Sequence, residues 1–230
     1  MTAVRNAPPG SDTPTPDFDI PVSLADRAYL ALRDRLIMLD IPPLSPIDDD
    51  EVSARIGLGR TPVREALTRL RAERLVVSYP RRGTFATAVD ISDLRHVCEV
   101  RTALEPLAAR RAATVAPGTR KAELAALAER IRRLDTARMD RRELMRWDVG
   151  VHRSVYRAAG NPYLEASLTL HANLATRIHC MFIDRMNHVA RHIDEHSALL
   201  HAIADGDPVR AERISLEHVL GFENAVREVL

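Results

Sequence analysis

The sequence predicts a mainly α-helical protein in two parts: an N-terminal winged helix-turn-helix of three helices and a β-hairpin wing, and an all-α bundle of six helices. Three observations predict this fold class. Within residues 21–89, helical patterns meet at a glycine turn and a hairpin pattern follows them. Within residues 90–230, apolar residues recur at three- and four-residue spacing and no strand pattern returns. Segments that contain proline and glycine divide this second part into helices.

Composition limits the class of protein. Residues 1–20 are expected to be a disordered tail, because they are rich in proline and poor in large apolar residues. No apolar run approaches the roughly 18 residues that a membrane span needs, and the N-terminus lacks a signal-peptide pattern, so the protein is expected in the cytoplasm. Cys98 and Cys180 have no paired spacing and are expected to be core thiols.

The helix-turn-helix is predicted from a turn and its flanking helices. A helix is expected over Asp49–Ile56, acidic at its start, where the helix dipole favours negative charge. The two glycines that flank Leu58 permit a sharp reversal. The next helix is expected to have Thr61 as its capping residue and Pro62 at its first position.

Two arginines mark the start of this next helix as a DNA-reading end. Arg60 and Arg64 are four residues apart and project toward the end that a helix-turn-helix presents to base edges and phosphates. Between residues 52 and 89 there are eight arginines and two glutamates, a net charge of 8 − 2 = +6, whereas the whole chain has +1. Arginines often lie solvated on helix faces, but their order with turn and cap favours a DNA-binding surface.

A hairpin wing is predicted after the reading helix. Residues 75–78 have the composition of a strand, residues 80–83 of a turn, and residues 84–87 of the returning strand. Arg82 and Gly83 lie in the turn, where they would approach the phosphates or the minor groove.

Six helices are predicted for the second part. Pro106 lies inside the first of them and is expected to kink it or to end its first half. The expected ranges are 92–114, 118–136, 140–158, 162–185, 188–204 and 208–229.

Histidine and aspartate spacing in the bundle indicates a metal site. Asp148 and His152 are four residues apart and share a helix face. His196 and His218 each lie 11 residues from Asp207, so a helical hairpin about that residue brings them level. Three imidazoles and a carboxylate suit zinc first, with nickel, manganese or iron as alternatives.

Spacing alone leaves two other interpretations of these histidines open. His188, His192 and His196 also follow a four-residue repeat. His192 would then replace His196 as the ligand, or all three would form one solvated face.

Residues 26–87 resemble the winged helix-turn-helix of GntR-type bacterial transcription regulators, in which the Arg60–Leu67 motif is specific. Family members usually carry a serine where this chain has Gly59, so one phosphate contact is absent. Residues 39–44 also replace the family's usual glycine and Pro-Gly before the second helix. The DNA contacts that the resemblance implies come from Arg35, Arg60, Thr61, Arg64, Arg82 and Gly83.

Residues 93–226 resemble the helical FCD domain of the FadR-type branch of that family. The matching pattern is an aspartate and a histidine four apart before Gly-Asn-Pro, followed by two later histidines. The resemblance implies a metal held by Asp148, His152, His196 and His218. It also implies that a small organic acid binds the metal beside other polar side chains. Candidates for binding this effector are Arg101, Asn173 and Arg177.

The effector candidates have simpler interpretations too. Arg101 is four residues from Glu105, so a surface ion pair is as well supported as carboxylate binding. Asn173 and Arg177 fit surface or interface positions equally.

The functional prediction is a homodimeric transcription regulator, a repressor in the commoner family mode, whose affinity for double-stranded operator DNA falls when the acid binds. Two heads are expected to read two half-sites. The alternative is a metal-dependent hydrolase that uses the same Asp/His cluster to activate water. That alternative does not explain the helix-turn-helix, and no His-Glu-x-x-His motif is present in the sequence.

Overall fold

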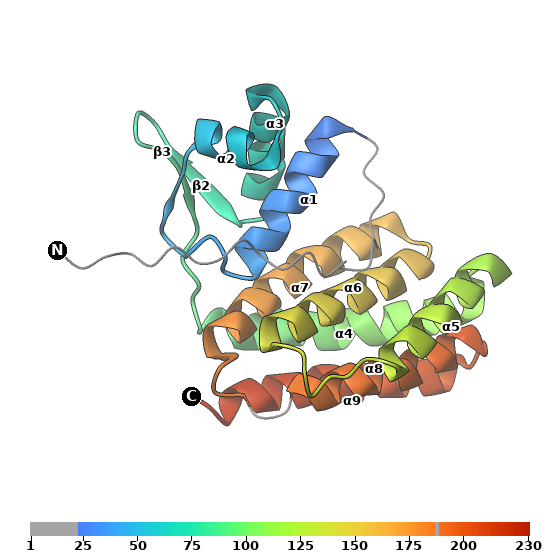
Figure 1. Ribbon diagram of the computed structural model, residues 1–230. Coiled ribbons are helices and arrows are strands. Elements are labelled where there is room, and N and C mark those ends of the chain that lie inside the picture. The colour runs from blue at the N-terminus through green and yellow to red at the C-terminus, as the bar shows by residue number, and fades with distance from the viewer. Residues whose placement is uncertain (1–22, 187–188) are drawn as a thin grey trace.

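The computed structural model describes residues 23–186 and 189–230. Residues 23–89, which we call the head, lie on one side of a helical bundle that starts at Asp93 (Figure 1). The mainly α fold with an N-terminal winged helix-turn-helix is confirmed. The predicted tail at residues 1–20 and His188 lie outside the described residues.

The head contains helices α1 (Leu24–Ile37), α2 (Asp49–Ile56) and α3 (Arg60–Ala72). Asp48 caps α2 by accepting hydrogen bonds from the amides of Asp50 and Glu51. Gly57 ends α2 with a positive φ of 66°, a conformation that glycine adopts without strain. The head has a small apolar core, in which the fully buried side chains include Leu32, Leu36, Val63, Leu70 and Leu75.

The predicted cap of α3 is wrong by two residues. The helix begins at Arg60, and Gly59 takes the capping position without a side-chain hydrogen bond. Thr61 is therefore the second helical residue and Pro62 the third. Because the first four amides of a helix have no partner within it, Pro62 still costs no hydrogen bond there.

The wing is part of a three-stranded sheet with the order β1-β3-β2. Strands β2 (Val76–Tyr79) and β3 (Gly83–Ala86) are antiparallel, as the sequence predicts, within one residue of the expected ends. Strand β1 (Pro46–Ile47) pairs with the outer side of β3 and was not predicted, because two residues are too short to show an alternating pattern. This pairing ties the wing to the connection between α1 and α2.

The bundle contains all six predicted helices. Three end earlier than expected: α5 by four residues, α7 by three and α9 by two. Helix α4 continues through Pro106, so the expectation that the helix ends there is wrong. The observed helices are α4 (Asp93–Val115), α5 (Gly118–Arg132), α6 (Arg141–Ala158), α7 (Pro162–Phe182), α8 (Val189–Ala204) and α9 (Pro208–Arg227).

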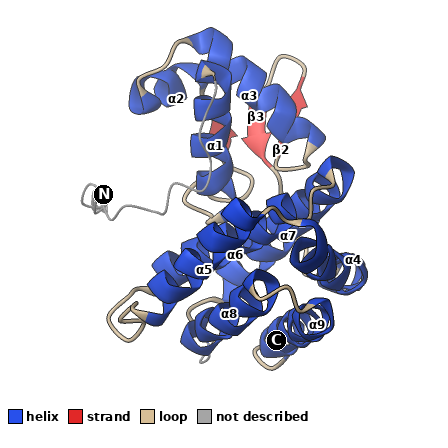
Figure 2. Cartoon of the chain, turned by 90° about the vertical axis from the view of Figure 1, so that its right-hand side faces the viewer, coloured by secondary structure: helices blue, strands red, loops and turns tan. Residues whose placement is uncertain are grey.

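Side-chain caps and prolines mark the starts of two of these helices. Asn161 caps α7 and Asp207 caps α9, each with a proline at the first helical position. The α8–α9 hairpin brings these two helices side by side against α4 and α6 (Figure 2). Helix α1 of the head lies against α7, so the head rests on the layer formed by α6 and α7. Among the described residues, no helix is long and apolar enough to cross a membrane.

Candidate metal centre and DNA-binding surface

Four buried side chains from three helices converge inside the bundle. Asp148 and His152 lie one turn apart on α6, His196 comes from α8, and His218 comes from α9. One potential ligand atom from each residue lies within 4.8 Å of every other. The predicted i, i+4 pair and the predicted helical hairpin therefore bring together the four residues that the sequence indicates.

The carboxylate of Asp148 is the centre of this cluster. Its Oδ1 atom lies 2.8 Å from Nε2 of His196 and 3.7 Å from Nε2 of both His152 and His218. Three imidazoles thus present the same nitrogen to one carboxylate oxygen. Zinc and similar transition-metal ions prefer a donor set of this kind, with one carboxylate oxygen and three imidazole nitrogens.

Two further carboxylates contact the Nδ1 atoms of two of these imidazoles, on the side away from Asp148. Glu105 Oε2 lies 3.0 Å from Nδ1 of His152, and Glu195 Oε2 lies 3.1 Å from Nδ1 of His218. Such contacts fix the tautomer and leave Nε2 as the atom that faces inward. Within the described part of the chain, the buried Nε2 of His152 has no hydrogen-bond partner. A bound ion would satisfy that atom, so the residues present fit a metal.

The protonation of the metal-free cluster follows from burial and from these contacts. Burial alone lowers the pKa of His218, but its hydrogen bonds with Asp148 and Glu195 outweigh burial and raise the pKa to about 9. Burial and the nearby His218 lower the pKa of His196 to about 4. Burial opposes ionisation of Asp148, yet the surrounding imidazoles hold its pKa well below the usual range.

His192 occupies a different place from His196. Its Nδ1 atom lies 3.2 Å from Glu195 Oε2, in a second group that includes His218. His196, one turn later on α8, is the residue that contacts Asp148. The geometry therefore favours His196 over His192 in the four-residue cluster.

A small cavity of about 10 Å³ lies beside the cluster. This volume is about that of one water molecule. Of the three predicted effector-binding residues, Arg101 and Asn173 line the cavity. The other residues that line it are Asp148, Val149, His152, Arg153, Tyr156, Thr169, Ala172, Thr176 and Phe222.

Arg101 forms the ion pair with Glu105 that the spacing allows, but the pair is buried and not on the surface. Its Nε atom donates to Glu105 Oε1 at 2.6 Å, and the Tyr156 hydroxyl donates to the same oxygen at 2.9 Å. Burial raises the pKa of Glu105, but the charges of Arg101 and His152 outweigh burial and keep it below its usual range. Glu105 therefore links a residue of the cavity to a residue of the cluster.

Arg177, the third predicted effector-binding residue, does not line this cavity. It projects from α7 toward the head, where its Nη2 atom donates to the carbonyl of Thr87 at 2.6 Å. Nη1 donates to the hydroxyl of the same threonine. Arg177 therefore fixes the connection between head and bundle. Asn173, one turn earlier on the same face of α7, lines the cavity, whereas Arg177 lies one turn further along the helix, at Thr87.

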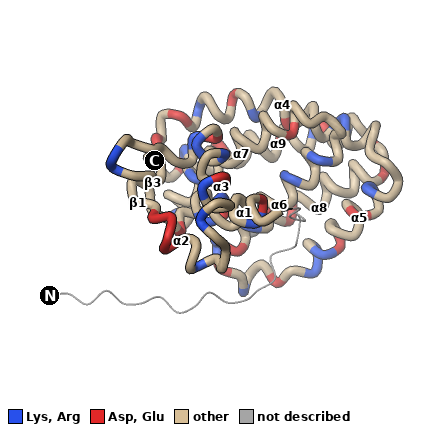
Figure 3. The backbone as a smooth tube through the Cα atoms, turned by 90° about the horizontal axis from the view of Figure 1, so that it is seen from above, with Lys and Arg blue, Asp and Glu red and all other residues tan. Residues whose placement is uncertain are grey.

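The predicted DNA-reading arginines lie at the exposed start of α3. The Arg60 and Arg64 side chains are 64% and 66% exposed. Arg60 Nη2 lies 2.8 Å from a carboxylate oxygen of Asp50, and Arg64 Nε lies 3.0 Å from one of Asp49. Figure 3 shows the acidic residues at the start of α2, in red, beside basic residues of α3, in blue. The arginines thus meet carboxylates in the positions where DNA phosphates would compete.

The other predicted DNA contacts lie on or near the same surface. Thr61 is exposed beside Arg60, and Arg82 and Gly83 are exposed at the tip of the wing. Gly83 has a φ of 92°, which makes a side chain unfavourable there. Arg35 is half-buried on α1. A hollow of about 160 Å³ separates α3 from the wing and is lined by Asp49, Arg64, Leu67, Thr68, Arg71, Ser78 and Thr84.

Sequence reasoning missed two residues of the site. Glu195 directly precedes His196, and Glu105 was considered only as a partner of Arg101. The sequence positions of Glu105 and Glu195 do not indicate that each carboxylate contacts an imidazole on another helix. A search for acidic residues behind the predicted ligands would have included Glu195, but only the packing of α4 against α6 shows Glu105.

Comparison with known proteins agrees with this geometry. Residues 24–86 match the family model described as bacterial regulatory proteins, gntR family, and residues 96–221 match the FCD domain model. The chain is 32% identical over 192 residues to a probable D-xylose utilization operon transcriptional repressor from Paenarthrobacter nicotinovorans, with 79% of each chain covered. It is 23% identical over 201 residues to the HTH-type transcriptional repressor RspR of Escherichia coli, with 87% of this chain and 88% of that protein covered.

The solved structure of E. coli McbR/YncC has the same fold. It aligns with a TM-score of 0.76 at 19% identity, over 90% of this chain and 98% of that chain. The matched families and relatives are transcriptional regulators and not enzymes, which removes the metal-dependent hydrolase as an interpretation of the Asp/His cluster. The chain therefore belongs to the GntR family of bacterial regulatory proteins and is a DNA-binding transcriptional regulator with an FCD domain.

Proposed function

We propose that this regulator is a homodimeric repressor that acts in the cytoplasm and releases its operator when a small organic acid binds beside a metal ion in the bundle. The observation that carries the proposal is the buried cluster of Asp148, His152, His196 and His218 next to the cavity lined by Arg101 and Asn173. Repression is supported by relatives that are named repressors.

The four cluster residues would hold a divalent ion, zinc in the first place, with nickel, manganese or iron as the other candidates. When bound, such an ion supplies an open coordination position that attracts a carboxylate. Asp148 supplies the negative charge, and the three imidazoles supply neutral nitrogen donors. Glu105 and Glu195 keep the rings of His152 and His218 aimed at the centre.

Polar residues of the cavity would orient the acid. Asn173 has a buried amide nitrogen without a hydrogen-bond partner in the described part of the chain, and this nitrogen is a ready donor to a carboxylate. Arg101 contributes positive charge, although Glu105 compensates most of it. A cavity of about 10 Å³ does not accommodate even acetate, so its walls must move when the acid enters.

The head would read DNA through α3, and the wing would contact the backbone. Arg60, Thr61 and Arg64 would approach bases and phosphates, while Arg82 and Gly83 would follow the groove beside them. Arg35 would contact a phosphate through α1. Two heads are proposed because a single one offers too small a surface for a specific operator site.

The test is binding of the purified full-length protein to DNA that flanks its own gene, with salt, zinc and a panel of carboxylic acids as variables. We expect salt-sensitive specific binding that Arg64→Ala abolishes without a change in metal content. His196→Ala is expected to lower metal occupancy in elemental analysis. Specific binding by Arg64→Ala would contradict the assignment of α3, and full metal occupancy in His196→Ala would contradict the proposed ligand set.

A further inference from the structure

Arg153 connects the head to the cavity beside the metal cluster. It follows His152 on α6, and its side chain is only 11% exposed. Its Nη1 atom donates to Asp34 Oδ1 on α1 of the head at 3.2 Å. Its Nη2 atom lies 3.4 Å from the side-chain oxygen of Asn173, in the cavity wall. One guanidinium therefore contacts both parts of the molecule.

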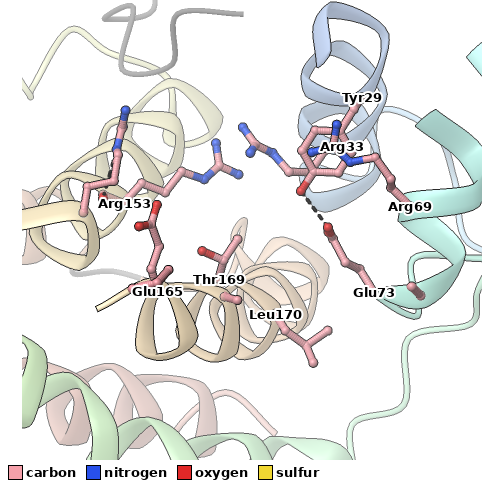
Figure 4. Close-up of a pocket in the computed structure, with 12 residues that line it drawn as sticks. Tyr29, Arg33, Arg69, Glu73, Arg153, Glu165, Thr169 and Leu170 are labelled. Carbon is pink, nitrogen blue, oxygen red and sulfur yellow. Dashed lines mark hydrogen bonds between the residues drawn. The ribbon is translucent and has the colours of Figure 1, made fainter. Parts of the chain in front are cut away.

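Asp34 is an anion that binds Arg153 at the junction. The same Oδ1 atom lies 3.1 Å from Nη2 of Arg33. Figure 4 shows the side chains of Arg33 and Arg153 approaching each other from opposite sides of the junction. Two like charges lie close only while the carboxylate between them compensates their repulsion. Asp34 therefore contributes to holding Arg153 in this position.

Arg153 also separates two cavities of very different size. The cavity beside the cluster has about 10 Å³, whereas the cleft between head and bundle has about 570 Å³. Arg153 and Thr169 line both. The cleft is bounded by α1 and α3 on the head and by α6 and α7 on the bundle (Figure 4). The side chain of Arg153 is thus a partition between them.

Arg153 is the wall residue that can move most easily when the small cavity enlarges to admit the acid. The other charged wall residue, Arg101, is held by a 2.6 Å ion pair with buried Glu105. Val149 and Phe222 are packed in the apolar core. Arg153 alone among the charged wall residues has open space behind it and an exposed partner, since the side chain of Asp34 is 47% exposed. An entering carboxylate would also offer Arg153 a bidentate partner in place of Asp34.

We propose that Arg153 is a further effector-binding residue whose guanidinium leaves Asp34 for the carboxylate of the incoming acid. Its movement opens the small cavity into the cleft and removes one tie between α1 and α6. Binding of the acid in the cavity thereby changes how the head is held against the bundle. This inference rests on the proposed function of the site, and it names the residue that links effector binding to DNA release.

The test compares Arg153→Gln with Arg146→Gln in the full-length, zinc-loaded protein. Arg146 is a matched control, because it lies two turns earlier on α6 and also bonds to the head, at 3.2 Å from Asp40, but does not line the cavity. Succinate, malate and lactate serve as probes. Acid binding is measured by calorimetry, and operator binding is measured by fluorescence anisotropy with and without acid.

We expect Arg153→Gln to bind these acids at least tenfold more weakly than the wild type and to keep its operator in their presence, with unchanged zinc content. Arg146→Gln is expected to respond like the wild type. Asp34→Asn removes the competing anion, so it should bind the acids more tightly than the wild type. This variant changes the acid affinity in the opposite direction, so it tests the inference even if Arg153→Gln folds poorly.

Three results would overturn the inference. Equal acid affinity and equal operator release in Arg153→Gln and the wild type would remove Arg153 from the site. Unchanged or weaker acid binding by Asp34→Asn would contradict the proposed competition between Asp34 and the acid for Arg153. If the wild type binds zinc and operator but none of a wider acid panel, the proposed effector control fails, and this inference fails with it.

Discussion

Glu105 Oε2 lies 3.0 Å from Nδ1 of His152, and both side chains are buried. The other oxygen of this carboxylate accepts hydrogen bonds from Arg101 and Tyr156. Glu105 therefore sets the orientation of His152 from α4, although it points none of its oxygens at Asp148. The chemistry of the cluster extends one layer beyond the four proposed ligands.

Glu105→Gln is expected to lower zinc affinity by about 10- to 100-fold, because the neutral amide holds the His152 ring less firmly and makes its Nε2 a weaker donor. Competition with a chromophoric chelator measures this affinity. Glu129→Gln, an exposed carboxylate on α5, is the control. Wild-type zinc affinity in Glu105→Gln would show that the contact does not position the ring.

Zinc binding is expected to release a proton and to strengthen as the pH rises toward 9. The pKa of His218 is raised to about 9, so this residue is protonated at pH 7 in the metal-free protein. A ligand nitrogen must lose its proton, and the affinity therefore falls as the pH drops below 9. Calorimetry at pH 7 in two buffers of different ionisation enthalpy counts the proton. Buffer-independent heats would contradict the expected release.

Asp50→Asn is expected to strengthen DNA binding severalfold, for operator and unrelated DNA alike. The wild-type carboxylate pairs with exposed Arg60, and exposed pairs contribute at most about 1 kcal/mol. Removing it frees the arginine for phosphate. Fluorescence anisotropy with both DNA types tests this expectation. Glu51→Gln is the matched control, since Glu51 pairs with Arg55 on α2 itself; an equal gain there would assign the effect to net charge alone.

Gly59→Ser is expected to stabilise the protein by a few tenths of a kcal/mol, because a serine hydroxyl would cap the free amides at the start of α3. The site accommodates the change: φ is −70°, and the nearest atom to an added Cβ is Pro62 Cδ at 3.9 Å. Chemical denaturation measures the gain, and Gly59→Ala separates the hydroxyl from the loss of glycine flexibility. Equal stability of the two variants would exclude a capping role.

Much of the fold could be predicted because its determinants are local. Gly57 and the acidic start of α2 define the turn, while proline-containing breaks define three of the five boundaries between the helices of the bundle. Strand β1 could not be predicted, since its two residues acquire their conformation only from pairing with β3. The start of α3 was misplaced because Thr61 is a good cap by residue type, and the preceding turn selects Gly59 instead.

The candidate site shows the same division between local and distant contacts. The pairing of Asp148 with His152 follows from helix spacing, and the hairpin about Asp207 brings His196 level with His218. The contact of Glu105 with His152 joins residues 47 positions apart in sequence (152 − 105 = 47) on two packed helices, so no spacing rule indicates it. Arg177 lies one turn after Asn173 and bonds to Thr87 instead of lining the cavity, a contact between head and bundle that helix spacing does not indicate.

The carboxylates that pair with Arg60 and Arg64 change the exchange of ions when the head binds DNA. An arginine that was free would displace a cation from the DNA and so contribute about 0.9 to the slope of log affinity against log salt concentration. Here each arginine would leave a carboxylate on α2 to contact a phosphate, and that carboxylate would then attract a cation from solution. The net release of ions would then be smaller than the number of phosphate contacts. We therefore expect operator binding by this head to be less sensitive to ionic strength than its arginines alone would make it.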